Sequence, residues 1–505
     1  MAIYIDPAMV PDLDNIDSKV FKYLIQKHKR QLARWAKCKD YYEGRHKILA
    51  KKADDDEDTV KLIVNYTKYV VDIGLGYYLG EPVKYNSDKA DKADKKRKEL
   101  EGGVKASIKN GSVQLYDPDL SQKLDISRIQ DVYDNETISE IDSKIGKAIG
   151  IYGEAYEQLY ANSAENPEPR STVVSPMNCI MVRDNTVEHN KLFAIIYEIQ
   201  EDLDESKYYS VTVCNDHNTK EYRSRDLDNF EFYFVEGSEQ EHYFGEVNVV
   251  EYQNNDERQG DFEQIISMQD ALNELFSDRV TDKKKFVNSI LAMFGMTLAD
   301  DDDKAVAKLK KDRFIDGLPH DGKIEYIQKT FDENSVSVLC KDIIREIHKM
   351  TLTVDMTDEN FAGNSSGQAL MLKLMVMNML VKNKMRSLEK GLKKRFEMYN
   401  HWLNVKGEMS LIDKKELDVV FTVAMPIDKP TIINMVTQLR GIVDDKTLLS
   451  QLWFIKDVDE AIENVKKQKA EEQQQYLATF GSQHAQDMET PIKDDEDEEK
   501  DPEKE

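Results

Sequence analysis

The sequence predicts an α+β protein that is predominantly helical. Long segments carry apolar residues at helical spacing, whereas the stretch from Tyr156 to Val250 breaks into short β-branched and aromatic runs. Clusters of Asn, Asp, Gly and Pro separate these runs, which favours a mostly antiparallel sheet. A chain of 505 residues exceeds the length at which a single hydrophobic core stops growing, so we expect several domains.

Composition restricts the classes of partner. The formal net charge of −26 opposes tight binding to a nucleic-acid backbone, since such binding relies on Lys and Arg displacing counterions. The four cysteines are scattered without paired or metal-ligand spacing, which is typical of reduced thiols in a cytosol. We expect no secretory signal, because the N-terminus lacks a basic region followed by an apolar one. We also expect no membrane span, because the longest dense apolar run, residues 369–381, is shorter than the roughly 18 residues that a bilayer requires.

In the N-terminal half the helices have recognisable ends. Periodic apolar residues predict a helix over 17–42 that Gly44 stops. A second helix is expected over about 65–78, followed by an irregular insertion or hairpin at 84–119. Residues 138–152 also have helical periodicity, and the sheet begins near Tyr156.

The string "GLGYYLGEPV" (Gly74 to Val83) resembles a phosphate-binding loop only superficially. Its glycines are spaced GxGxxxG, one residue too long for the dinucleotide fingerprint, and they follow a helical pattern instead of opening a helix after a strand. We interpret Gly80 and Pro82 as a structural turn that ends the helix, and Gly74 and Gly76 as positions of close packing.

Helical periodicity returns at Asp261 and again after Asp332, which is a candidate N-cap. Residues 287–329 between these helices suggest a small α/β insertion. A polar Gly/Asn/Ser loop follows, and then a helix of roughly 30 residues that reaches Trp402. The string "ELDVVFTVAMP" predicts a strand, and further helices are expected over 429–476. The low-complexity end after Phe480 is expected to be disordered, and residues 489–505 carry ten acids against three lysines.

Enzymatic motifs are missing from the sequence. It contains no HExxH, CxxC or GxSxG string, and "GNSSGQA" (Gly363 to Ala369) lacks the Lys and the spacing of a P-loop. The aspartate clusters at 54–56 and 300–303 could bind Mg²⁺, but consecutive carboxylates on a loop are usually solvated. We therefore predict no catalytic, metal-binding or cofactor-binding residues and no cofactor.

Several strings, in this order along the chain, resemble the portal proteins of tailed double-stranded DNA bacteriophages of the siphophage type. They are "VNYTKYVVDIGLGYYLGEPVKY", "YGEAYEQLYANS", "SPMNCIMVRDN", "LFAIIYEI", "GEVNVVEYQNNDERQGDFEQIISMQDALNELFSDRVTD", "NSSGQALMLKLMVMNMLVKNKMRSLEKGLKKRF" and "LDVVFTVAMPIDKPTIINMVTQLRGIVDDKTLLSQL". The resemblance extends from about residue 60 to 475, whereas residues 84–119 and 287–329 follow no pattern that we can match residue by residue.

The resemblance implies a portal fold with wing, stem, clip and crown regions. We expect the N-terminal part and wing at 1–260, a first stem helix at 261–286, a clip at 287–331, a second stem helix at 332–352 and a tunnel loop at 353–367. A long kinked helix and a return strand of the wing are expected at 368–428, crown helices at 429–480 and a disordered acidic tail at 481–505.

The resemblance also implies a ring, usually of twelve subunits in the virion, around a channel for the genome. Its implied partners are further copies of itself, double-stranded DNA passing without sequence readout, the large subunit of the terminase, head-completion or adaptor proteins, and the major capsid and scaffolding proteins. It implies a location at one capsid vertex of the virion, and in the host cytoplasm during assembly. The tunnel-loop residues expected to face DNA are Asp355, Thr357, Asp358, Glu359, Asn360, Asn364, Ser365 and Ser366. Candidate basic residues of the channel are Lys283, Lys284, Lys285, Lys308, Lys310 and Lys311, although a solvated helix face would also explain them.

Two other classes of function fit parts of the sequence. A metal-dependent DNA-processing enzyme such as a nuclease would use the aspartate clusters. An acidic helical scaffolding protein would explain the charged tail but not the β-rich middle.

Overall fold

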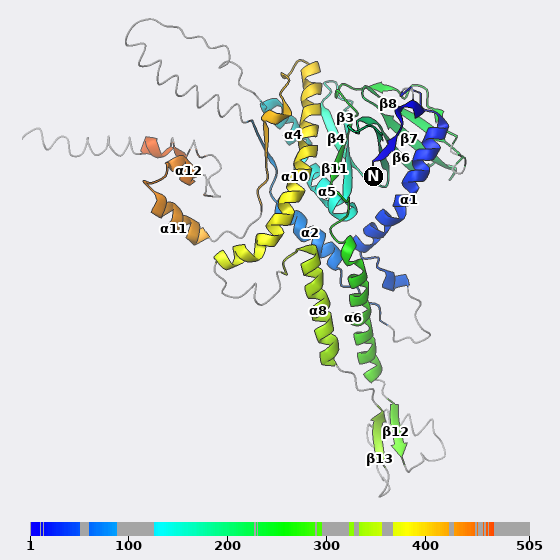
Figure 1. Cartoon of the computed structure of the whole chain (residues 1–505), viewed down its shortest axis with the longest axis vertical. Helices are drawn as coiled ribbons and strands as arrows, with labels where there is room; N and C mark the ends of the chain where they lie inside the picture. Colours follow the sequence, from blue (N-terminus) through cyan, green and yellow to red (C-terminus); the bar gives the residue numbers. More distant parts are fainter. Residues whose placement is uncertain are drawn as a thin grey trace, which may run out of the picture. The chain divides into compact units, whose positions relative to one another are not determined.

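The computed structural model of the chain describes residues 2–10, 12–13, 15–50, 60–87, 126–226, 229, 231–287, 290–294, 323–327, 333–355, 367–423, 429–449, 452, 458, 461–462 and 464–468 (Figure 1). The chain divides into two compact units. The first, here called the body, comprises Met1–Asn364 and Leu370–Ala424, and the C-terminal unit comprises Ser365–Ala369 and Met425–Glu505.

The larger sheet of the body has seven strands within the described residues. Its order is β1-β5-β6-β7-β8-β10, with β9 paired to β8. The strands are β1 (Ile3–Ile5), β5 (Cys179–Asp184), β6 (Lys191–Glu201), β7 (Lys207–Cys214), β8 (Asn218–Ser224), β9 (Tyr233–Phe234) and β10 (Gln240–Glu241). All pairs are antiparallel except β1 with β5, so the mostly antiparallel sheet is confirmed, and the sequence-based prediction missed its N-terminal strand.

Helix α1 (Ser18–Tyr42) packs on this sheet. Phe21, Leu24 and Ile25 are fully buried and share one apolar cluster with strand residues such as Val182 and Phe193. The side chain of Asp17 caps the helix by accepting from the Lys19 N–H at 2.9 Å. Gly44, with φ 82°, lies just beyond its end, so the predicted bounds of this helix are confirmed.

A second, three-stranded sheet and several helices form the largest apolar core. The sheet order is β11-β3-β4, with β3 (Glu154–Ala161), β4 (Pro169–Val174) and β11 (Val249–Gln253). The helices are α2 (Tyr66–Leu79), α4 (Ser127–Glu136), α5 (Ile138–Tyr152) and α10 (Gly367–Val405). The predicted helix over 138–152 is confirmed, α4 was not predicted, and α10 is 39 residues long where roughly 30 were expected.

A two-stranded ribbon joins distant parts of the chain. Strand β2 (Lys84–Ser87) pairs antiparallel with β14 (Leu417–Val420). Residues 84–119 were expected to form an irregular insertion or a hairpin; the first four form a strand that pairs outside this segment, and residues 88–119 lie outside the described part. The strand expected at "ELDVVFTVAMP" is confirmed only over Leu417–Val420, because residues 421–423 are not paired.

The glycines that allow close packing of α2 lie in α5. A Cβ on Gly146 would come within 2.4 Å of the Leu79 side chain, and one on Gly150 within 3.1 Å of Val71. Nothing lies within 4 Å of a Cβ on Gly76, so the role predicted for that glycine is wrong. Gly80 does cap the end of α2, where a Cβ would meet the Gly76 carbonyl oxygen.

Two further helices lie side by side in the body (Figure 1). Helix α6 (Ile266–Val287) follows the short 3₁₀ helix η4 (Glu263–Ile265), and α8 (Glu333–Thr351) returns beside it. Strands β12 (Ile290–Phe294) and β13 (Lys323–Ile327) form an antiparallel hairpin between them in the chain. The helix predicted from Asp261 thus begins five residues later, because residues 261–265 form a turn and η4.

Other 3₁₀ helices in the described part of the body are η1 (Pro7–Met9), η2 (Lys47–Ala50) and η5 (Lys414–Glu416). In the C-terminal unit, α11 (Lys429–Leu439) and α12 (Asp445–Leu449) confirm helices in the region where they were expected. The predicted acidic tail lies outside the described residues.

Candidate functional site

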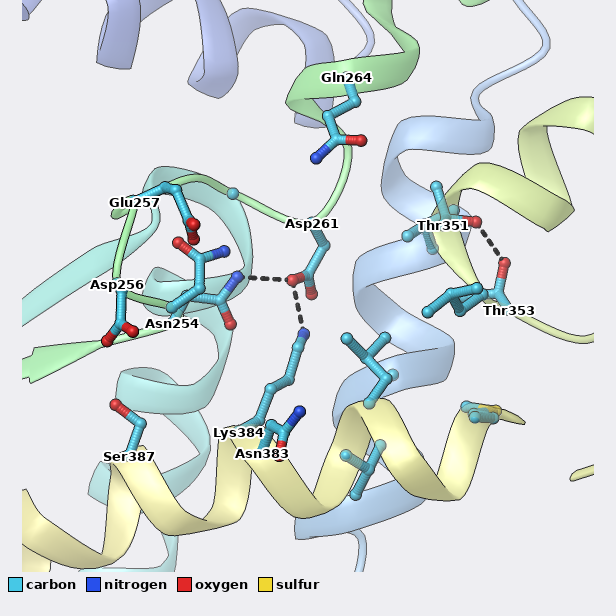
Figure 2. Close-up of a pocket in the computed structure, with 18 of the residues that line it drawn as sticks. Asn254, Asp256, Glu257, Asp261, Gln264, Thr351, Thr353, Asn383, Lys384 and Ser387 are labelled. Atoms are coloured by element: carbon cyan, nitrogen blue, oxygen red, sulfur yellow. Dashed lines mark hydrogen bonds and ion pairs between the residues drawn. The ribbon is translucent and has the colours of Figure 1, made fainter. Parts of the chain in front are cut away.

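The body contains a pocket of about 580 Å³ where four segments meet (Figure 2). These are α2, the turn between β11 and η4, the end of α8, and the middle of α10. The turn supplies polar side chains such as Asn254, Asp256 and Glu257, whereas α10 supplies Lys384 and Arg386. The pocket therefore marks the junction between the helix pair α6–α8 and the long helix α10.

A buried ion pair lies in the wall of this junction. Lys384 Nζ is 2.5 Å from Asp261 Oδ1, and the two side chains are only 6% and 10% exposed. The same oxygen accepts from Asn254 Nδ2 at 2.8 Å, as Figure 2 shows. The Asp261 N–H donates to the Gly150 carbonyl oxygen at 2.8 Å, which fixes the residue beside α5. One carboxylate thus joins the turn before α6 to α10.

A second buried cluster holds the C-terminal half of α10. Arg395 is fully buried, and its guanidinium lies 2.7 Å from Asp142 Oδ1 in α5 and 3.2 Å from Glu157 Oε1 in β3. It also donates to the Tyr85 hydroxyl in β2 at 2.7 Å. Burial raises the pKa of Asp142, although Arg395 opposes this change. Because its partners come from three different elements, Arg395 holds α10 to α5, β3 and β2.

Helix α6 binds an extended segment of backbone by a ladder of polar side chains. Thr281 Oγ1, Ser277 Oγ, Asn273 Oδ1 and Gln269 Oε1 accept hydrogen bonds from the backbone N–H groups of Val60, Leu62, Val64 and Tyr66, at 2.9 to 3.0 Å. Four residues of helix rise about 6 Å, and two residues of extended chain rise about 6.6 Å. The two repeats therefore stay in register over the length of the ladder.

The ladder is tied to α1 through His46. Burial lowers the pKa of His46, so the ring is neutral. In that form Nδ1 accepts from Asn273 Nδ2 at 2.7 Å and Nε2–H donates to the Tyr41 carbonyl oxygen at 2.9 Å. The sequence contained the signal, since Gln269, Asn273 and Ser277 recur every four residues at buried positions of an otherwise apolar face, but the sequence-based prediction missed it.

The predicted basic residues of the channel are placed only in part. Lys283 Nζ lies 2.7 Å from Glu333 Oε2, so this side chain is paired with α8. Lys284 is exposed, and Lys285 lies in the last turn of α6. Lys308, Lys310 and Lys311 lie outside the described residues.

The predicted loop is likewise placed only at its start. Asp355 is half-buried, with Oδ2 3.7 Å from His348 Nε2 in α8. The other predicted loop residues lie outside the described part, namely Thr357, Asp358, Glu359, Asn360, Asn364, Ser365 and Ser366. The predicted turn is placed in full, since Gly80 caps α2 and Pro82 follows two residues later.

The described residues offer neither a metal-binding cluster nor a membrane-spanning helix. No group of three or more His, Cys, Asp or Glu side chains there could hold a metal ion, and the aspartate clusters at 54–56 and 300–303 lie outside that part. Among the described helices, none combines the length and the apolar composition that a bilayer span requires.

The mixed helices and strands of the described residues fit the α+β class, and a comparison with known families identifies the class of protein. The model of the family described as "Phage portal protein, SPP1 Gp6-like" matches residues 21–475, and the chain belongs to that family. It is therefore a phage portal protein.

A curated relative is the portal protein of Bacillus phage SPP1, which is 21% identical over 244 residues. That alignment covers 47% of this chain and 47% of the relative, so it spans about half of each.

Proposed function

We propose that copies of this chain assemble into a ring at one vertex of a phage capsid, and that double-stranded DNA enters and leaves through the channel of the ring. The match of the portal family over residues 21–475 carries this proposal. In the proposed assembly α6 and α8 form the stem, the segment between them forms the clip, and α11 and α12 belong to the crown.

The charge of the chain suits a channel that must not retain DNA. A ring repeats each subunit's charge, and the chain carries a net charge of −26. A strongly basic lining would hold the duplex by counterion release, whereas an acidic one leaves it weakly bound and free to move. Basic side chains that face the channel would lower the barrier that the acids create.

The proposed contact with moving DNA is the loop at 353–367, including Asp355, Thr357, Asp358 and Glu359. It follows α8 and leads into α10, which the Lys384 and Arg395 ion pairs hold to the body. A polar loop between two anchored helices can adapt to a passing duplex without reading its sequence.

Partners of the ring follow from the same proposal. The clip would dock the terminase motor, which supplies ATP hydrolysis, and later the head-completion or adaptor proteins. The ring would also contact the major capsid and scaffolding proteins and initiate assembly of the procapsid in the host cytoplasm.

Negative-stain microscopy and light scattering of the purified protein test the assembly. We expect rings of twelve or thirteen subunits, and a monomer of 58.4 kDa at all concentrations would contradict the proposal. Deleting residues 360–366 should leave rings intact but abolish DNA packaging, so normal packaging by that variant would refute the role of the loop. Mg²⁺-dependent DNA cleavage by the purified chain would instead favour the nuclease alternative.

A further inference from the structure

The helix pair α6–α8 carries two rows of opposite charge. On α6, Asp270, Glu274 and Asp278 recur every four residues and form the acidic row. On α8, Lys341, Arg345 and Lys349 recur with the same spacing and form the basic row. Residues four apart lie on one face of a helix, with a rise of about 6 Å per step, so the two rows have matching repeats.

The basic row faces away from α6. The face of α8 that packs in the body includes Val336, Cys340, Ile343 and Ile347, in one apolar cluster with Leu272 of α6. At about 100° per residue, the basic row lies roughly opposite this face. The exposure of its side chains agrees with this orientation, since Arg345 and Lys349 are both 71% exposed.

The acidic row faces away from α8 as well. Leu272, Leu275 and Phe276 belong to the cluster shared with α8, whereas the adjoining ladder face of α6 is covered by residues 60–66. About 100° per residue places the acidic row on a third face. Glu274 and Asp278 are exposed there, while Asp270 is half-buried and its Oδ1 accepts from the Tyr41 hydroxyl at 2.7 Å.

The two rows lie at similar heights along the helix pair. Arg279 and Lys283 of α6 both bind Glu333 at the start of α8, at 2.9 and 2.7 Å, which sets the antiparallel register. Counting from those contacts, Glu274 is roughly level with Lys341, and Asp270 roughly level with Arg345, at about 1.5 Å per residue.

Contacts within α8 leave the basic row able to bind a further carboxylate. Arg345 pairs with Asp342 at 2.9 Å and Lys349 with Glu346 at 3.3 Å, both three residues away on the same helix. Exposed pairs of this kind contribute little to stability, because water screens both charges. Val338, which is 58% exposed, lies on the same face and offers apolar contact.

We infer that the basic row of α8 in one copy of the chain binds the acidic row of α6 in the next copy. This inference rests on the proposed ring and names the surfaces that join its subunits. A contact between two different faces is heterologous, so it repeats from copy to copy and closes a ring when the rotation allows. Opposite charges at the contact also offset the repulsion between copies that each carry a net charge of −26.

Charge reversal tests the pairing. The basic-row variant carries Lys341→Glu and Arg345→Glu, and the acidic-row variant carries Glu274→Lys and Asp278→Lys. A control with Lys19→Glu and Arg30→Glu changes two exposed residues of α1 and alters net charge as the basic-row variant does. Native mass spectrometry and light scattering at about 0.1 M salt, where screening extends over about 10 Å, would give the fraction of chains in rings.

We expect each row variant to retain a folded circular-dichroism spectrum and to lose ring formation at least tenfold, since like charges then face each other. A variant that combines Lys341→Glu with Glu274→Lys should recover rings to within about threefold of the wild type, because these two positions are roughly level and opposite charges then face each other again. The α1 control should assemble like the wild type.

The other outcomes overturn the inference. Normal rings from the basic-row variant would do so, and if those rings also failed to package DNA, the basic row would be a contact for DNA phosphates. Failure of the combined variant to recover, or an equal loss in the α1 control, would show that the rows do not bind each other. A wild-type protein that forms no ring would instead contradict the proposed function itself.

Discussion

Replacing Lys384 with Met should destabilise the body by about 3 kcal/mol. Removing one partner of a buried ion pair generally costs about 3 to 5 kcal/mol, because an uncompensated charge remains. The value should lie at the lower end here for two reasons. Asp261 keeps the hydrogen bond from Asn254 at 2.8 Å, and the adjoining pocket of about 580 Å³ can admit water to the carboxylate.

Urea unfolding followed by tryptophan fluorescence measures this loss, because Trp35 and Trp402 are buried in the body at 0% and 7% exposure. The neutral double variant Asp261→Asn/Lys384→Met should lose only about 1 kcal/mol, since no buried charge remains. Lys393→Met is a matched control on the same helix, whose half-exposed pair with Glu389 should contribute less than about 0.5 kcal/mol. The reasoning would be refuted if the stability of the Lys384→Met variant lay within about 0.5 kcal/mol of the wild type, or if the double variant were no more stable than the Lys384→Met variant.

Three further predictions address other parts of the body. Gly153→Ala should cost more than about 2 kcal/mol and Gly237→Ala about 1 to 2 kcal/mol, because both have positive φ but only the Cβ on Gly153 would meet backbone atoms; equal losses in urea unfolding would be inconsistent with this. Hydrogen bonds from Arg279 and Lys283 of α6 lower the pKa of Glu333 to about 2. The stability that this carboxylate contributes should therefore be fully present above its ordinary pKa of 4.5 and be lost as the pH falls through about 2. A carboxyl NMR titration of Glu333 with a midpoint near 4.5 would contradict this. Asn273→Leu leaves the half-buried Val64 N–H without this acceptor and should cost about 1 kcal/mol, with faster hydrogen exchange over residues 60–66; unchanged exchange there would count against the ladder.

Elements with local signals could be predicted from the sequence. Asp17 and Gly44 carry the cap and the stop of α1, and the periodic residues of 138–152 coincide with α5. Helix α4 was missed although Ile129, Val132 and Tyr133 recur at helical spacing, since its N-cap residue, Ile126, provides no side-chain cap.

Pairings between distant segments could not be predicted. Strand β2 is four residues long and forms only against β14, more than 300 residues later in the chain. The residues of either strand do not identify the other as its partner, because backbone hydrogen bonds do not depend on side-chain identity. The repeat of Gln269, Asn273 and Ser277 along α6 was visible in the sequence, but only folding shows that residues 60–66 are its partner.

In the candidate site, too, some features could be predicted from the sequence and others could not. The charge of the loop and the order of helices were evident from the sequence, whereas the pairing of Lys283, a predicted channel residue, with Glu333 was not. Arg395 lies in the string "GLKKRF", which is charged enough to suggest a solvated face, yet its side chain is fully buried.

The sequence by itself determined the family, the helical periodicities and the acidic charge, because each depends on neighbouring residues or on composition. Only the tertiary structure decided which charges are buried and paired, since Arg395 and Lys384 find their carboxylates on elements far away in the chain. A buried charge is tolerated only where folding supplies its partner, so its role depends on three-dimensional contacts that local pattern does not encode.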